Sequence, residues 1–293
     1  MIKFSSVGVT LSLATLLSHN ALSSPIPIDF SNESEMVGFY ASAHYNLELP
    51  MFSPISVKYK STGNSEADKS EKELTLFTLK ESTQAPDFTK KETFNDKSGY
   101  KPVYNRNYTG FSGAVGYSGG GIRVEIEGAF TRFDVDKQKH THPDNHRYFA
   151  SCTEQEMKPA QQNGSSKDGN YVVMKNEGFK AISLTFNVCY DMIVSNSSLI
   201  PSACVGIGQG ITNFLGATNI HTIFQAKLGL GFSISPKTIL FANGYYVKTK
   251  DDAFTNLTVQ YPVKLTSPPT HIDPVVYFHS DYCGGEVGLR FIL

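Results

Sequence analysis

The chain has 293 residues, of which 40% are hydrophobic and 18% are charged, and its formal net charge at pH 7 is -1. With 26 basic residues against 27 acidic residues and no long basic block, the composition argues against a nucleic-acid partner. After the first 23 residues, no apolar run approaches the roughly 20 residues that a helical membrane span needs. A membrane protein built from strands remains compatible with these values.

Residues 1–23 have the pattern of a signal peptide. Lys3 supplies a positive start, Val7–Leu17 form an uncharged apolar stretch, and small residues lead up to Ser23. We expect cleavage after Ser23, which leaves residues 24–293 as one exported domain. The alternative, a buried N-terminal helix, is disfavoured because two prolines follow at once.

Apolar and polar residues alternate through most of the remaining chain, as in strands that have one apolar face and one polar face. In Ile122–Phe130, for example, isoleucine and valine alternate with Arg123, Glu125 and Glu127. Eight stretches are expected to be strands, at about 36–48, 108–118, 121–135, 178–192, 200–209, 220–235, 238–249 and 281–293.

Such strands fit either a soluble β-sandwich or a membrane barrel. Several of them reach the length of about 9 to 11 residues that crosses a bilayer. Short turns are expected at 118–121, 195–199 and 235–237, and long connections at 48–107, 136–170, 209–219 and 248–279. The chain also ends in an amphipathic strand, which is typical of substrates of the barrel-assembly machinery. These features favour the barrel.

We therefore expect an all-β fold, an antiparallel up-and-down transmembrane β-barrel of eight strands with long external loops. Two weaker strand candidates, Ile55–Lys60 and Leu74–Lys80, either extend a hairpin above the membrane or raise the strand count to ten. The count matters because side chains fill the interior of an eight-stranded barrel, whereas wide channels need more strands.

Six charged residues are expected to point into the barrel: Arg123, Glu125, Glu127, Lys227, Glu286 and Arg290. In a wide barrel they would line a mixed-charge channel, and in a narrow one they would form ion pairs that close it. The aromatic residues expected to face lipid are Phe39, Tyr45, Phe111, Tyr117, Phe130, Phe133, Phe186, Tyr190, Phe232 and Phe291.

The exported part contains four cysteines, Cys152, Cys189, Cys204 and Cys283, which allow three disulfide connectivities. Cys189 and Cys204 flank an expected turn, so they are a candidate cross-strand disulfide.

Motifs for metals, cofactors and catalysis are weak in this sequence. His140, His142, Asp144 and His146 could bind a transition metal, but Pro143 interrupts their spacing and a solvated loop is the favoured reading. The glycines at 206–210 lack the partners of a phosphate-binding loop, and no nucleophile elbow is present. We therefore expect no metal, no cofactor and no catalytic residue.

Short motifs along the whole exported chain resemble the major surface antigen family of the Anaplasmataceae, which are immunodominant outer membrane proteins of rickettsia-like bacteria. The segments that carry the resemblance are 38–40, 110–118, 123–127, 146–148, 175–178, 187–191, 204–208, 227–230 and 288–291. The last residue, Leu293, departs from the aromatic residue that is usual in the family.

The resemblance implies a surface antigen in the bacterial outer membrane, with variable loops exposed at the cell surface and no enzymatic activity. Some members of the family act as porins, which gives the expectation of a pore for small hydrophilic solutes. The alternative is a non-conducting barrel scaffold that acts as an adhesin in host-pathogen interaction. The expected partners are outer membrane lipid, the barrel-assembly machinery, the host-cell surface and antibodies.

Overall fold

The computed structural model describes residues 36–60, 71–81, 86–88, 90–137, 144–152, 171–193, 197–250, 252–260 and 274–293. The expected signal peptide lies outside this part of the chain. Within the described residues, no helix is both long enough and apolar enough to cross a membrane.

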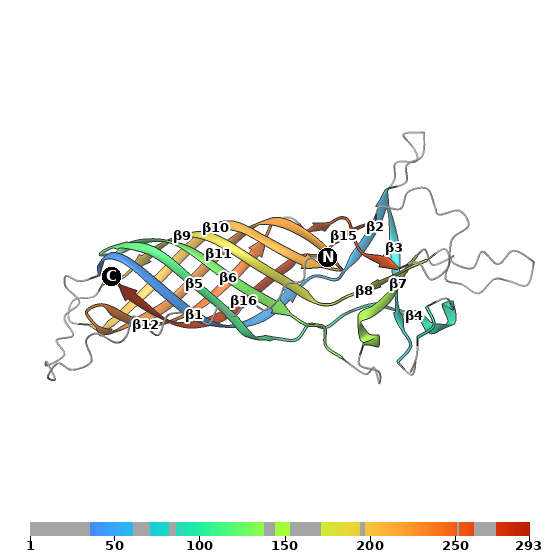
Figure 1. The fold of residues 1–293 in the computed structure, drawn as a ribbon, viewed down its shortest axis with the longest axis horizontal. Coiled ribbons are helices and arrows are strands. Elements are labelled where there is room, and N and C mark those ends of the chain that lie inside the picture. Colours follow the sequence, from blue (N-terminus) through green and yellow to red (C-terminus); the bar gives the residue numbers. More distant parts are fainter. Residues whose placement is uncertain are drawn as a thin grey trace, which may run out of the picture.

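Eight antiparallel strands close into a barrel, and each is paired with the barrel strands before and after it in the sequence (Figure 1). They are β1 (Val37–Phe52), β5 (Asn107–Gly119), β6 (Ile122–Phe133), β9 (Phe179–Asp191), β10 (Leu199–Phe214), β11 (Ala217–Ser235), β12 (Thr238–Thr249) and β16 (Ser280–Ile292). Pairing of β1 with both β5 and β16 closes the barrel. This confirms the predicted up-and-down barrel of eight strands.

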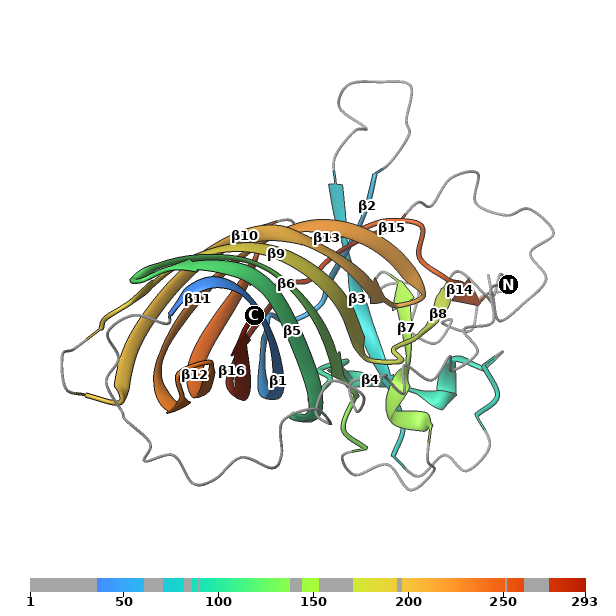
Figure 2. The ribbon, with the colours of Figure 1, turned by 60° about the vertical axis from the view of Figure 1, so that its left-hand side comes forward.

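A second sheet lies beyond one end of the barrel (Figures 1 and 2). It contains β2 (Ser56–Lys60), β3 (Glu71–Leu79), β4 (Phe94–Gly99), β7 (Tyr148–Cys152), β8 (Val172–Lys175), β13 (Ala253–Phe254), β14 (Val259–Gln260) and β15 (Pro274–Tyr277). The 3-10 helices η2 (Lys91–Thr93) and η3 (Asn145–Arg147) each form one turn between strands. The predicted strands near 55–60 and 74–80 therefore pair with one another outside the barrel wall.

The predicted loop at 209–219 is wrong, because β10 and β11 continue through it and are joined only by Leu215 and Gly216. Both residues have positive φ, 49° and 78°, as in a two-residue type I′ hairpin. The polar residues of this region suggested a loop. A strand that projects above the lipid can be polar on both faces, so polarity alone does not end it.

The outer wall of the barrel is apolar because alternate residues point away from the interior. Leu228 is 71% exposed and Ile220 is 68% exposed, values expected of side chains that contact lipid. Nine of the ten aromatic residues predicted to face lipid lie on this wall. Phe133 does not, since it is fully buried inside the barrel mouth. It follows Phe130 by three residues, and an odd spacing in a strand reverses the face.

Aromatic rings fill the space between the barrel mouth and the second sheet. Phe278, which follows β15, stacks on Phe214 of β10 with ring centroids 4.1 Å apart. Phe52 at the end of β1 contacts Phe278 and Phe133, at 5.0 and 5.1 Å. These rings belong to one buried cluster that also includes residues of the second sheet, such as Val57. The cluster therefore attaches the sheet to the barrel.

Replacing Phe278 with alanine is expected to loosen the second sheet while the barrel stays closed. Loss of a fully buried phenylalanine costs about 3–5 kcal/mol, and the lost contacts all lie at the sheet-barrel junction. Limited proteolysis of the refolded protein should cut the sheet faster, whereas its heat-modifiable migration in SDS gels should persist. The control is Phe232→Ala on the outer wall. Equal cleavage of Phe278→Ala and the unaltered protein would contradict this account of the junction.

Candidate functional site

All six charges predicted to point inward are buried in the barrel interior, with exposed fractions between 2% and 6%. Arg123, Glu125 and Glu127 occupy alternate positions of β6, Lys227 lies on β11, and Glu286 and Arg290 lie on β16. Because the wall outside is apolar, each of these groups has to find its partner inside. They form two clusters along the barrel axis.

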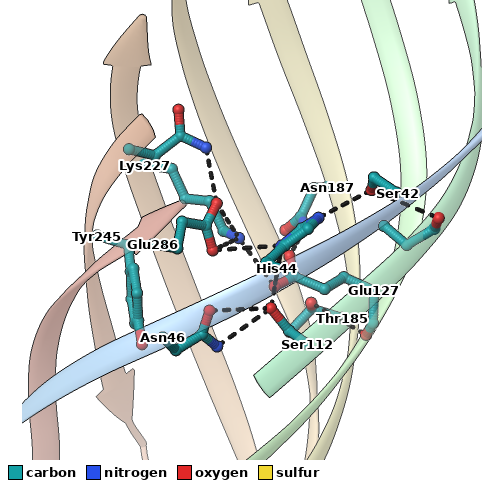
Figure 3. A network of polar contacts seen from close by, with 12 residues as sticks. Ser42, His44, Asn46, Ser112, Glu127, Thr185, Asn187, Lys227, Tyr245 and Glu286 are labelled. Carbon is teal, nitrogen blue, oxygen red and sulfur yellow. Dashed lines mark hydrogen bonds and ion pairs between the residues drawn. The ribbon is translucent and has the colours of Figure 1, made fainter. Parts of the chain in front are cut away.

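The central cluster consists of Lys227, Glu127, Glu286 and His44 (Figure 3). The Lys227 ammonium donates to Glu127 Oε1 at 2.8 Å and to both oxygens of Glu286, at 3.0 and 2.8 Å. His44 Nδ1 lies 3.4 Å from Glu286 Oε2. One ammonium thus joins β11 to β6 and β16 across the interior.

The lower cluster lies nearer the short turns and contains Arg123, Arg290, Asp191, Glu125 and Tyr40. Arg123 and Arg290 both donate to Asp191 Oδ2, at 3.1 and 3.0 Å. Arg123 also forms a hydrogen-bonded ion pair with Glu125, which accepts a 2.5 Å bond from the Tyr40 hydroxyl. Two cations therefore balance two carboxylates, and the Tyr40 ring packs against both guanidinium groups.

The side-chain amide of Asn187 joins the two clusters. It donates to Glu125 at 3.1 Å and to Glu127 at 2.9 Å. Amides can bridge in this way because they carry two N–H donors. The interior is consequently one connected polar network.

Glu48 lies above the central cluster and accepts only from neutral groups among the described residues. Its Oε1 accepts from Tyr245 at 2.8 Å and from Thr131 at 2.9 Å, and its Oε2 accepts from Asn107 at 2.5 Å. These donors come from β12, β6 and β5. Glu48 therefore ties β1 to three other strands of the wall.

Three interior groups were missed by the sequence prediction, namely His44, Glu48 and Asp191. All three share the polar parity of their strands, and the same alternation that identified Arg123 would have identified them. Among the residues that the structure describes, the interior holds three lysine or arginine side chains and five carboxylates: Arg123, Lys227 and Arg290 against Glu48, Glu125, Glu127, Asp191 and Glu286.

Above Glu48 the aromatic cluster covers the interior. It includes Tyr100 and Tyr104, which lie between the barrel and the second sheet. Burial raises the pKa of both hydroxyls above the usual value of 10.0, at which a tyrosine is already neutral at physiological pH. Uncharged rings therefore occupy the mouth of the barrel, and paired charges occupy the interior below it.

Cys189 and Cys204 are directly opposite one another on β9 and β10 and are joined by a disulfide. Both side chains are buried and point into the barrel. Cys152 lies in the second sheet and Cys283 on the outer wall.

Two groups of side chains have the composition of metal ligands, but the structure gives each another role. In the first, Glu125 lies beside Cys189 and Cys204, whose sulfurs are bonded to each other. In the second, His44, Glu127 and Glu286 surround the Lys227 ammonium, which supplies the positive charge. Of the histidine-rich motif, His140 and His142 lie outside the described residues, His146 is buried, and Asp144 lies 3.5 Å from Arg147.

A closed barrel with an apolar outer wall, short turns at one end and a long, folded extension at the other defines an outer membrane β-barrel. The sequence profile of the family described as surface antigen matches residues 31–293. The chain belongs to this surface antigen family, and it lies in the bacterial outer membrane with the second sheet exposed at the cell surface. It follows that the end with short turns faces the periplasm.

The chain is 26% identical to major surface antigen 4 of Anaplasma marginale over 297 aligned residues, which cover 98% of this chain and 95% of the relative. Among solved structures, the outer membrane protein OprG of Pseudomonas aeruginosa is 11% identical, with a TM-score of 0.49 over 88% of this chain and 97% of OprG. Neisserial surface protein A is also 11% identical, with a TM-score of 0.37 over 87% of this chain and 97% of that protein.

Replacing Lys227 with methionine is expected to lower the free energy of unfolding by about 3–5 kcal/mol, because Glu127 and Glu286 lose their shared cation. Urea unfolding of the refolded barrel measures this change. The exposed Lys237→Met on a periplasmic turn is the matched control, and it should change stability by less than about 0.5 kcal/mol.

The double variant Lys227→Met/Glu286→Gln should recover part of the lost stability, since it removes one of the two carboxylates left without the cation. If the double variant loses as much unfolding free energy as Lys227→Met and Glu286→Gln together, the two side chains do not interact, which would contradict the proposed cluster.

Proposed function

We propose that this surface antigen is a non-conducting barrel scaffold that presents its folded extracellular sheet and loops to the host-cell surface and to antibodies. The observation that carries the proposal is the filled interior. Along the barrel axis from the periplasmic end to the mouth, the interior contains, in this order, the lower cluster, the central cluster, Glu48 and the aromatic cluster. A hydrophilic solute would have to break these contacts to pass.

The energetics favour a barrel that stays closed. Separating a buried ion pair leaves each charge without a partner, at a cost of several kcal/mol. Lys227 alone holds three such contacts, to oxygens of Glu127 and Glu286. An open pathway would also require the aromatic cluster at the mouth to separate. The pore for small hydrophilic solutes is therefore the less favoured alternative.

The second sheet supports the role in presentation. It is built from segments of three connections between barrel strands, so residues far apart in the chain lie side by side in it. The aromatic cluster attaches it to the barrel mouth. A folded sheet held on a rigid barrel can present a defined surface, which free loops cannot do without a large entropic cost on binding. The proposed role is non-enzymatic.

Planar-bilayer recordings of the refolded full chain should show no steady channels. Folding is checked first by heat-modifiable migration in SDS gels, so that an absence of conductance cannot be attributed to misfolded protein. Steady, voltage-independent conductance from folded protein would overturn the closed-barrel proposal in favour of the pore.

Lipid vesicles that carry the full chain should adhere to host cells more than protein-free vesicles of the same lipid. Antibody fragments against the second sheet should reduce adhesion to the protein-free level, because that sheet is the proposed contact surface. Fragments against the periplasmic turn at Lys237 are the control. Adhesion equal to that of protein-free vesicles would count against host contact and leave the closed barrel unaffected.

A further inference from the structure

In the described barrel strands, four charged side chains lie on the outer wall, all near the extracellular ends of their strands: Arg132, Lys180, Lys248 and Asp281. Asp281 is already satisfied, because it accepts from the Tyr246 hydroxyl at 2.6 Å and from the Thr249 amide at 2.9 Å. The remaining three are cations. They lie at the extracellular edge of the band of large apolar side chains on this wall, a band in which the hydrogen-bonded pair Gln209 and Thr222 is also polar. Charged side chains are expected at this height, where a barrel leaves the hydrocarbon layer.

Two of these cations are neighbours. Arg132 of β6 and Lys180 of β9 are directly opposite each other in the antiparallel pairing, and both point outward. Like charges in this arrangement repel and destabilise a sheet. Asp134 offsets one of them through two bonds to Arg132, at 3.0 and 2.9 Å. Among the described residues, Asp134 is paired with Arg132, and Lys180 forms no ion pair. The pair therefore retains one positive charge.

The pairing register shows what lies below this pair. Ile220, Ile211, Ile182 and Phe130 are consecutive partners across β11, β10, β9 and β6, and they form an outward apolar row. Two residues further toward the extracellular ends, Thr218, Asn213, Lys180 and Arg132 are consecutive partners on the same strands. Within one repeat of these four strands, the outward side chains therefore change from apolar to hydrogen-bond donating.

We propose that Arg132, Lys180, Asn213 and Thr218 form a ledge that binds the phosphate-bearing headgroup of an anionic lipid in the outer leaflet. The headgroup phosphate would accept from the guanidinium and ammonium groups, while the acyl chains lie along the apolar row below. The Asn213 amide donates to the Thr218 hydroxyl at 3.0 Å, and Asn213 is the cross-strand partner of Lys180. The adjacent cations match the anionic headgroup of such a lipid, and the apolar row below them matches its acyl chains.

The inference is tested on the full chain, purified in mild detergent with added phosphatidylglycerol or with phosphatidylcholine of the same acyl chains. Native mass spectrometry then measures how much lipid the folded protein retains. We expect preferential retention of phosphatidylglycerol. Lys180→Gln and Arg132→Gln should each lower that retention about fivefold, the factor expected for one cation near a membrane surface.

Two comparisons separate the ledge from a general charge effect. Lys237→Gln removes one positive charge at the periplasmic end and should leave retention unchanged, and Lys180→Arg should keep most of it. Equal loss in Lys237→Gln and Lys180→Gln would overturn the proposal. Folding of each variant is verified by heat-modifiable migration, and Arg132→Gln, which removes the other cation of the pair, provides the test if Lys180→Gln does not fold.

Inorganic phosphate distinguishes a lipid from a free anion. Because the ledge is proposed to use the acyl chains as well as the phosphate, millimolar inorganic phosphate should not displace phosphatidylglycerol. Complete displacement would show that the donors recognise a free anion and would reject the lipid as the occupant.

Discussion

The shared ammonium of Lys227 is the interaction on which the closed barrel depends most directly. It lies between carboxylates of two strands that are far apart in the sequence, with 100 residues separating Lys227 from Glu127 and 59 separating it from Glu286. Glu127 and Glu286 are each only 2% exposed, so neither carboxylate can readily exchange this partner for solvent. The closed sheet brings these charges together, and a closed sheet that left them unpaired would have a high free energy. Barrel closure and charge pairing therefore depend on each other.

Much of this arrangement could be predicted from the sequence because a strand has a period of two. The alternation around Arg123 and Glu125 specified which side chains point inward, and it applied equally to His44 and Asp191. The strand ends were harder to predict. At Thr212 and Asn213 polarity suggested a loop, whereas the hairpin of β10 and β11 continues above the lipid. Polarity locates the membrane boundary, and it locates the end of a strand only where the two coincide.

The pairing of the interior charges could not be predicted from the period alone. Parity places Lys227 and Glu286 inside, but the choice of partner depends on the stagger of β11, β6 and β16 around the barrel. That stagger accumulates over all eight pairings, and a change of two residues in any one of them would bring different groups together. The second sheet is a similar case, because its pairings such as β3 with β7 join connections whose sequences have only weak alternation.

The filled interior also explains why the extracellular sheet can be held firmly. A barrel with a wide lumen would leave the sheet without an apolar surface to pack on, whereas here Phe52, Phe133 and Phe179 close the mouth and provide one. The charges below need a dry, ordered environment to remain paired, and the aromatic cluster supplies it by excluding water from above. Filling of the barrel interior and attachment of the second sheet therefore depend on the same aromatic rings, and separating these rings would also remove the apolar surface on which the sheet packs.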